Sequence, residues 1–425
     1  MKKLNTIHLK NIKGTENLET VQLPTPKRVK LPMLMSIGDT CTPFVKVGDE
    51  VFVGQKIGDS KAFLSLPIHS SVSGKVVAIS DYTLANGKTC KAVEIETDGK
   101  QTISPNISKP IISSKESFLN AVRESGSCGL GGAGFPTYIK LDSKTPIDTL
   151  IINGAECEPY ITSDYRQMME TPNDIINGIK FVMQCLDIPK TKIAIESNKA
   201  KAIELLKKLT ENSPEIEVVS LPSRYPQGAE KVIIYSTTGR IVGEGQLPSE
   251  QGVIVINVST VAFVYQYMQN GIPLVSKRIT VEGDAIQKPC NVFVPIGTSV
   301  SDILSFAEVE TDEIKKLVFG GPMMGMSQHS FETPIVKTSN AILAFKTYTE
   351  QVETACIRCG RCISVCPMNL MPVELEKAYI HKNVKDLEQL KVVLCMNCGC
   401  CSYGCPANRK LAESHQLAKA LIQKR

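Results

Sequence analysis

Residues 356–367 read CIRCGRCISVCP, and residues 395–406 repeat the pattern as CMNCGCCSYGCP. These two runs contain nine of the fifteen cysteines in the 425-residue chain. Each run places three cysteines at CxxCxxC spacing and a fourth directly before a proline. Because such spacing recurs twice within one short segment, it indicates metal-binding thiols rather than cysteines that only fill a core.

The spacing is the ligand pattern of bacterial proteins with two [4Fe–4S] clusters, in which the fourth cysteine of each run binds the other cluster. Three thiolates on one tight loop can bind three irons of a cubane. We therefore predict one cluster on Cys356, Cys359, Cys362 and Cys405, and a second on Cys395, Cys398, Cys401 and Cys366. Cys400 lies outside the spacing and is predicted not to be a ligand.

Two other uses of these cysteines fit the sequence less well. Disulfides are disfavoured because the N-terminus, MKKLNTIHLKNIKG, lacks the apolar region of a secretory signal. A zinc site needs neither the third cysteine of each run nor the Cys-Pro ending. The chain is therefore predicted to move single electrons.

Composition narrows the class of protein. A length of 425 residues predicts several domains, and 42% apolar residues suffice for ordinary cores. The net charge of +5 is too small to indicate a nucleic-acid partner. The longest apolar stretch, residues 253–267, is interrupted by polar side chains, so no transmembrane segment is predicted. We expect a soluble or peripheral protein of the cytoplasm.

Near the N-terminus, residues 31–97 alternate strand-like pieces with glycine and proline. VKVGDEVFVGQ and PIHSSVSGKV resemble the barrel-sandwich hybrid of biotinyl and lipoyl domains. A carrier domain would present a modified lysine, and Lys61 in GDSKAF is the nearest candidate. Its offset from Pro67 is shorter than in a lipoyl hairpin, which favours a structural module with an unmodified lysine.

A glycine-rich loop, CGLGGAGFPTYIKL at 128–141, precedes the buried strand TLIIN at 149–153. Dense glycines let several backbone N–H groups point at a phosphate. Further strands, KIAIES and VIVIN, alternate with helical segments and predict an open α/β sheet. Asn153, Glu156 and Glu158 follow the carboxyl end of their strand, where such sheets bind ligands.

The motifs GLGGAGFPT, NGAECEP, YPQGAEK and VINVST resemble those of the NADH-binding flavoprotein subunit of respiratory complex I. The resemblance implies FMN as cofactor and NAD(H) as substrate. It implies cofactor-binding roles for Gly129, Gly131, Gly132, Gly134, Phe135, Lys140, Asn153, Glu156, Glu158, Glu230 and Asn257. Phe135 would stack on the adenine, and Glu156 would orient the ribose or the nicotinamide.

Three positions depart from that family's pattern. Leu130 replaces an arginine, Ala155 an aspartate, and Ala229 the first glutamate of a Gly-Glu-Glu segment. A Rossmann-like domain that has lost its flavin is therefore kept as an alternative.

The following segment, residues 271–345, resembles the β-grasp-like (SLBB) domain that follows the FMN domain in complex I. The whole order resembles the RnfC family, the C subunits of Rnf complexes. The predicted fold is multidomain α/β and α+β, with a barrel-sandwich hybrid, a Rossmann-like FMN domain, a β-grasp-like domain and an α-helical two-cluster ferredoxin domain. The predicted boundaries are 1–105, 106–270, 271–345 and 346–425.

Membership of the Rnf family implies a peripheral subunit on the cytoplasmic side of the membrane, with membrane-embedded and ferredoxin-like subunits as partners. It would exchange hydride with NAD(H) at FMN and single electrons through two clusters, while partner subunits translocate ions. No side chain is predicted to act as a catalytic acid or base. Two alternatives are a soluble electron carrier for proline reductase and a cluster relay with an inactive flavin site.

Overall fold

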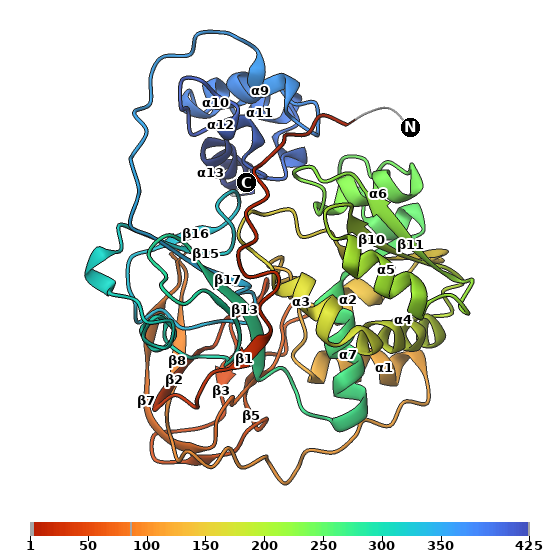
Figure 1. The fold of residues 1–425 in the computed structure, drawn as a ribbon, viewed down its shortest axis with the longest axis vertical. Helices are drawn as coiled ribbons and strands as arrows, with labels where there is room; N and C mark the ends of the chain where they lie inside the picture. The colour runs from red at the N-terminus through yellow and green to blue at the C-terminus, as the bar shows by residue number, and fades with distance from the viewer. Residues whose placement is uncertain (1–3, 86, 424–425) are drawn as a thin grey trace.

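The structure, a computed structural model, describes residues 4–85 and 87–423 (Figure 1). Its parts are a β-rich barrel-sandwich region, an α/β region, a mixed sheet and a helical region that carries the cysteine runs. Figure 1 shows the cysteine-rich helices stacked above the other three parts. Within the described residues, no helix is long and apolar enough to cross a membrane.

The barrel-sandwich region consists of two small antiparallel sheets, with strand orders β2-β8-β7-β4 and β3-β5-β6. Val29 and Leu31 of β2 pack in its core against Val93 and Ile95 of β8. The strands are β2 (Arg28–Pro32), β3 (Thr42–Pro43), β4 (Glu50–Val51), β5 (Lys56–Asp59), β6 (Ile68–His69), β7 (Gly74–Thr83) and β8 (Thr89–Thr97). This architecture confirms the predicted barrel-sandwich fold.

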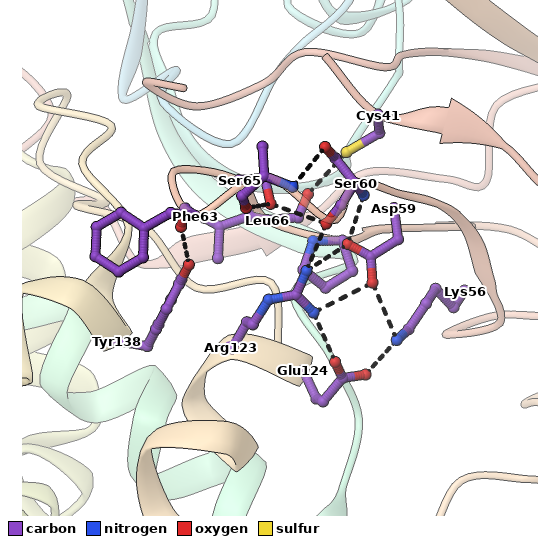
Figure 2. Close-up of polar contacts among 12 residues, drawn as sticks. Cys41, Lys56, Asp59, Ser60, Phe63, Ser65, Leu66, Arg123, Glu124 and Tyr138 are labelled. Atoms are coloured by element: carbon purple, nitrogen blue, oxygen red, sulfur yellow. Dashed lines mark hydrogen bonds and ion pairs between the residues drawn. The ribbon is translucent and has the colours of Figure 1, made fainter. Parts of the chain in front are cut away.

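The loop between β5 and β6, which carries Lys61, is fixed to helices α1 (Lys115–Glu124) and α2 (Thr137–Leu141) (Figure 2). The Arg123 guanidinium donates to Asp59 Oδ1 at 2.7 Å, and the Tyr138 hydroxyl donates to the Phe63 carbonyl. The loop is thus anchored on both sides of Lys61 instead of standing free as a carrier hairpin.

The α/β region is built on a parallel sheet with strand order β11-β10-β9-β12. Its strands are β9 (Thr149–Gly154), β10 (Thr191–Glu196), β11 (Ile216–Leu221) and β12 (Val253–Asn257). Its further helices are α3 (Ser163–Glu170), α4 (Pro172–Leu186), α5 (Ala200–Leu209), α6 (Glu230–Thr238), η1 (Pro248–Gln251) and α7 (Val258–Asn270). The mixed α/β character agrees with the sequence prediction.

Both faces of this sheet are covered, which explains why its strands are apolar runs without polar alternation. Leu150 and Ile152 pack among residues of α1, α3, α4, α5 and α7, whereas Ile151 packs against α6 on the opposite face. All three side chains are fully buried, and burial of one such side chain stabilises the fold by roughly 1.5–3 kcal/mol. The sheet therefore holds the carboxyl ends of β9 and β12 at fixed positions.

The mixed sheet has strand order β1-β14-β13-β17-β15-β16. Its elements are β1 (Thr20–Gln22), β13 (Ser276–Glu282), β14 (Cys290–Pro295), α8 (Val300–Phe306), η2 (Thr311–Glu313), β15 (Lys316–Phe319), β16 (Met326–Gln328) and β17 (Ala341–Phe345). Ile279, Val292 and Ile303 lie in its core.

The N-terminal segment packs outside the two barrel-sandwich sheets. Residues 4–22 do not pack within the barrel-sandwich region: β1 pairs in parallel with β14 of the mixed sheet, and Ile7 forms a β-bridge with Tyr225 of the α/β region. The Asn5 side chain donates to the Cys366 carbonyl at 3.3 Å. Backbone groups of β14, Tyr225 and Cys366 thus pair with the segment, which runs along three regions (Figure 1).

The cysteine-rich region contains α9 (Arg361–Ser364), α10 (Pro372–Ile380), α11 (Val384–Gln389), η3 (Val392–Leu394), α12 (Cys400–Tyr403) and α13 (Leu411–Gln423). Leu375, Leu387, Val392 and Ala418 form its small apolar core. Residues 346–360, which connect it to β17, are exposed. Packing against the other regions must therefore position these helices.

Candidate functional site

The strand ends of the α/β sheet bring two predicted site residues together. Asn153 at the end of β9 and Asn257 at the end of β12 are direct partners in the register of the two strands. The Asn153 side-chain amide donates to the Gly228 carbonyl at 2.8 Å. Asn257 accepts hydrogen bonds from Ser259 N and caps α7. Both asparagines thus lie at the sheet edge where open α/β folds bind ligands.

The glycine loop closes on itself beside this edge. Gly129 N donates to the Phe135 carbonyl at 2.9 Å, and Gly134 N donates to the Gly129 carbonyl at 3.1 Å. A Cβ on Gly131 would lie 2.7 Å from Asn257 Nδ2, and one on Gly134 would lie 2.6 Å from the Thr338 side chain. A side chain at Gly131 would have to displace the Asn257 amide, and the left-handed backbone of Gly134, with φ of 65°, favours glycine.

The exposed part of the loop suits an anion. Gly131, Gly132 and Ala133 are exposed, and within the described chain their three backbone N–H groups have no hydrogen-bond acceptor. Successive free N–H groups in a glycine loop form a concavity that binds phosphate. The loop therefore fits the phosphate of FMN, while Asn153 and Asn257 offer side-chain amides nearby.

Other predicted site residues lie around the loop. Lys140 of α2 and Glu230 at the start of α6 form an ion pair at 2.6 Å across the sheet edge. Both side chains are partly exposed, so the pair itself adds little stability and both remain accessible to a ligand. Phe135 is half-buried directly after the loop.

The carboxylates of Glu156 and Glu158 accept hydrogen bonds from backbone N–H groups of the protein. Glu156 is buried and accepts hydrogen bonds from Asp164 N at 2.8 Å and Tyr165 N at 3.2 Å at the start of α3. Glu158 accepts from Met323 N at 3.0 Å and Met324 N at 2.9 Å in the turn before β16. In this arrangement neither carboxylate points free into the site.

The pKa of each of these two carboxyls is raised to about 7. Burial is the main cause for both, since it disfavours the charged form. At Glu156 the neighbouring Asp164 adds to the rise, whereas Lys13 and Lys199 oppose it. At Glu158 the two backbone N–H groups and Lys13 oppose it.

Two residues escaped the sequence prediction. Asp164 accepts hydrogen bonds from Asn257 Nδ2 at 2.7 Å and from Ser259 Oγ at 2.6 Å, and so fixes the orientation of the Asn257 amide. Tyr225 is the first residue of the YPQGAEK motif and reaches the cysteine-rich region. The sequence gives no sign of either contact, because the partners of these residues are distant along the chain.

The two cysteine runs fold as a structural repeat. Arg358 and Asn397, each between the first two cysteines of its run, have left-handed backbones with φ of 56° and 54°. The N–H of each lies 3.4 Å from the sulfur two residues earlier, Cys356 and Cys395 respectively. Backbone N–H groups that point at cysteine sulfur stabilise the thiolate form that iron binds.

One predicted ligand set lines a single cavity. Cys366, Cys395, Cys398 and Cys401 line it together with mostly apolar side chains. Burial raises the pKa of the Cys401 thiol, and the three other thiols raise it further. As thiolates the four sulfurs would repel one another, and bound iron would remove that repulsion. The cavity therefore fits a cluster.

The other predicted set lies at the surface. Cys356 and Cys359 are exposed, and Cys362 is half-buried. Burial raises the pKa of the Cys362 thiol, and the neighbouring thiols of Cys405 and Cys356 raise it further. Cys405 from the second run thus lies beside the first run, a placement that fits exchange of the fourth ligand.

Neither set is arranged for a mononuclear metal. Within the part of the chain that the structure describes, no three His, Cys, Asp or Glu side chains could hold one metal ion. In a cubane each thiolate binds a different iron, so its four sulfurs are spread around the cluster. Cys400, which is fully buried, lines the same cavity as the inner set.

The cavity lies where the cysteine-rich region contacts the α/β region and the mixed sheet. The Tyr225 hydroxyl donates to the Cys398 carbonyl at 2.7 Å. A Cβ on Gly399 would lie 2.9 Å from the Met323 carbonyl. The turn before β16, which contains Met323, therefore contacts the cysteine loop. The buried set of thiols therefore lies next to the α/β region, whereas Cys356 and Cys359 of the other set are exposed.

Three stretches of the chain match models of protein families. Residues 4–100 match the RnfC barrel sandwich hybrid domain, residues 122–266 the Nuo51 FMN-binding domain, and residues 355–409 the 4Fe-4S dicluster domain.

Relatives of known name match most of the chain. The C subunit of the proton-translocating ferredoxin:NAD(+) oxidoreductase complex of Clostridium ljungdahlii is 42% identical, covering 85% of this chain and 80% of that protein. The C subunit of the Na(+)-translocating complex of Acetobacterium woodii is 40% identical, covering 85% and 83%. The C subunit of the ion-translocating oxidoreductase complex of Rhodobacter capsulatus is 36% identical, covering 97% and 81%.

Among solved structures, a chain of the NAD+-reducing [NiFe]-hydrogenase in the air-oxidized state has a similar fold, with a TM-score of 0.51. It is 17% identical, and the match covers 73% of this chain and 61% of that chain. At this identity the likeness extends to the fold alone.

The pKa of Glu158 predicts a pH-dependent stability. In the folded protein the pKa of Glu158 is about 7, above the ordinary value of 4.5. The protonated Glu158 carboxyl therefore stabilises the fold fully below pH 4.5, and this stabilisation is lost as the pH rises through 7. Between about pH 5.5 and 8 the free energy of unfolding should fall by about 2 kcal/mol more in the natural protein than in Glu158→Gln. Urea unfolding at several pH values measures this difference.

Glu116→Gln, at an exposed position of α1, is the matched control and should follow the natural protein. If the natural protein and Glu158→Gln gave parallel pH profiles, the raised pKa of Glu158 would be refuted.

Proposed function

The chain belongs to the RnfC family, the C subunits of ion-translocating ferredoxin:NAD+ oxidoreductases, and from this membership we propose how its residues bind cofactors and carry electrons. It is an oxidoreductase subunit with an FMN-binding domain and a 4Fe–4S dicluster domain. When bound, FMN exchanges a hydride with NAD(H) and single electrons with the two [4Fe–4S] clusters. This function agrees with the first one predicted from the sequence, that of an Rnf subunit that exchanges hydride with NAD(H) and single electrons through two clusters.

The flavin site comprises the glycine loop and the ends of β9 and β12. The free N–H groups of Gly131 and Gly132 hold the phosphate, and the loop is closed by Gly129 and Gly134. Asn153 and Asn257 would donate to the flavin from the sheet edge, and Lys140 would contact the flavin or the nucleotide. These roles combine the observed geometry with the resemblance to complex I.

The nucleotide site lies on the open side of the same loop. Phe135 offers an aromatic face to the adenine, and the Lys140–Glu230 pair offers a charge of each sign to ribose and phosphate. Glu156 and Glu158 act indirectly in this proposal, because they hold α3 and the Met323–Met324 turn in place. No residue acts as a general acid or base.

Electrons would pass through two cluster sites in order. Cys366, Cys395, Cys398 and Cys401 form the inner site, and Cys356, Cys359, Cys362 and Cys405 form the outer site. The observation that carries this order is the hydrogen bond from Tyr225, next to the flavin motif QGAEK, to the Cys398 carbonyl. The outer site is exposed and is available to a partner protein.

The remaining assignments rest on family membership. The mixed sheet is proposed to be the β-grasp-like (SLBB) domain, which packs the flavin domain against the inner cluster. The chain is proposed to act as a peripheral subunit on the cytoplasmic side, where NAD(H) is found. Membrane-embedded and ferredoxin-like subunits of the complex would exchange electrons with the outer cluster and translocate the ions.

Reduction by NADH tests the function. The full chain, reconstituted anaerobically with FMN, iron and sulfide, should lose flavin absorbance and then cluster absorbance when NADH is added. Protein reconstituted without FMN is the control and should keep its clusters oxidised, because they cannot accept a hydride. Bound FMN that stays oxidised in excess NADH would exclude NADH as the donor.

Iron content tests the exchanged ligands. Cys366→Ser should lower iron from about eight to about four per chain, because one [4Fe–4S] cluster is lost. Combining it with Cys398→Ser should cause no further loss, whereas combining it with Cys359→Ser should remove nearly all iron. Cys400→Ser is the matched control and should retain both clusters. Further iron loss in the first pair and none in the second would reverse the assignment.

A further inference from the structure

Two buried lysines lie beside the glycine loop, and the proposed function gives neither a role. Lys277 on β13 has 5% of its surface exposed, and Lys337, before β17, has 1%. Among the described residues, neither ammonium has a carboxylate within ion-pair distance. Neither ammonium therefore forms an ion pair within the described chain, and Asp164 and Asp59 act on Lys277 and Lys337 only from beyond ion-pair distance.

Backbone carbonyls are the partners of both ammonium groups. Lys277 Nζ donates to the Leu130 carbonyl at 2.6 Å and to the Lys337 carbonyl at 2.8 Å. Lys337 Nζ donates to the Pro67 carbonyl at 2.7 Å and to the Gly126 carbonyl at 2.9 Å. Lys277 thus contacts the glycine loop itself, whereas Lys337 contacts the chain before it.

A buried cation without a counter-charge is costly. Transfer of an ammonium from water into a protein interior is unfavourable unless another charge compensates it. Burial lowers the pKa of each lysine to about 8, so at neutral pH each remains mostly protonated. A bound anion close to Lys277 would add to the partial compensation that Asp164 provides.

The peptide between Leu130 and Gly131 connects Lys277 to the exposed side of the loop. A trans peptide is planar, and its C=O and N–H point in opposite directions. Because the Leu130 oxygen points inward to Lys277, the Gly131 N–H points away from the ammonium. This N–H begins the series of N–H groups, from Gly131 to Ala133, that lack an acceptor within the described chain.

We propose that Lys277 is a positioning residue for a phosphate ester bound at Gly131–Ala133: it fixes the orientation of the 130–131 peptide and increases the donor strength of its N–H. The proposal rests on the proposed function, because it assumes that this loop binds a cofactor phosphate. The favoured ligand is the 5′-phosphate of FMN. The diphosphate of the nicotinamide dinucleotide offers the same chemistry.

Riboflavin, which is FMN without its phosphate, separates this role from a purely structural one. Dissociation constants for FMN and riboflavin are measured by flavin fluorescence, with the flavin-free full chain carrying its clusters. In Lys277→Met the FMN affinity should fall roughly 10- to 100-fold, the range for loss of a charge-assisted hydrogen bond. The riboflavin affinity should change by less than about twofold, since the isoalloxazine contacts remain.

Two further variants complete the comparison. Lys277→Arg keeps the cation and should restore most of the preference for FMN over riboflavin. Lys337→Met is the matched control, because it removes an equally buried lysine that does not contact residues 129–134, and it should leave that preference unchanged. If Lys277→Met fails to fold by circular dichroism, Lys277→Gln, which can still donate to the Leu130 carbonyl, replaces it and should also lose the preference.

Each outcome bears on the proposal. Equal losses of affinity for FMN and riboflavin, or no loss of affinity for FMN, riboflavin or NADH, would overturn it. A loss of NADH affinity with FMN and riboflavin unchanged would support it and assign the phosphate to the dinucleotide. If the natural chain bound neither FMN nor riboflavin, the flavin function itself would fail, which is distinguishable from failure of the lysine's role.

Discussion

The contact between the Tyr225 hydroxyl and the Cys398 carbonyl is the interaction on which the arrangement of the cofactor sites depends. Tyr225 is almost completely buried, and its backbone pairs with Ile7 of the N-terminal segment. On the other side of the cysteine loop, Gly399 leaves no room for a side chain against the Met323 carbonyl. The loop is therefore held between the α/β region and the mixed sheet, although its covalent connection through residues 346–360 is long and exposed.

The N-terminal segment also stabilises this junction. The Lys13 ammonium donates to the carbonyls of Glu156, Glu158 and Ile161. These hydrogen bonds hold the chain that follows β9 in place. Glu158 in turn holds the Met323–Met324 turn, which touches Gly399. A continuous series of contacts thus links residue 13 to the inner cysteine loop. This explains why the segment does not pack within the barrel-sandwich region that follows it in sequence.

The sequence was most informative where local chemistry dictates spacing. The cysteine runs, the glycine loop and the apolar strands could be predicted directly, because ligand geometry, backbone conformation and burial each constrain neighbouring residues. Tyr225, Asp164 and Lys277 could not, because their partners lie on other elements that only docking brings close. Glu156 and Glu158 match a flavoprotein motif, yet their carboxylates bind backbone N–H groups of α3 and of the turn before β16. A motif therefore located the site without specifying which side chains face the ligand.

The central claim is that electrons enter from the flavin at the buried thiols and leave at the exposed ones. The most direct test is the rapid reduction of the FMN-loaded chain by NADH, followed by freeze-quench EPR, in Cys359→Ser and Cys398→Ser. The account predicts that the inner cluster is still reduced at the natural rate when the outer one is disrupted. With the inner cluster disrupted, the flavin should bleach while the outer cluster stays oxidised on the same time scale. Reduction of the outer cluster at the natural rate in Cys398→Ser would contradict the account.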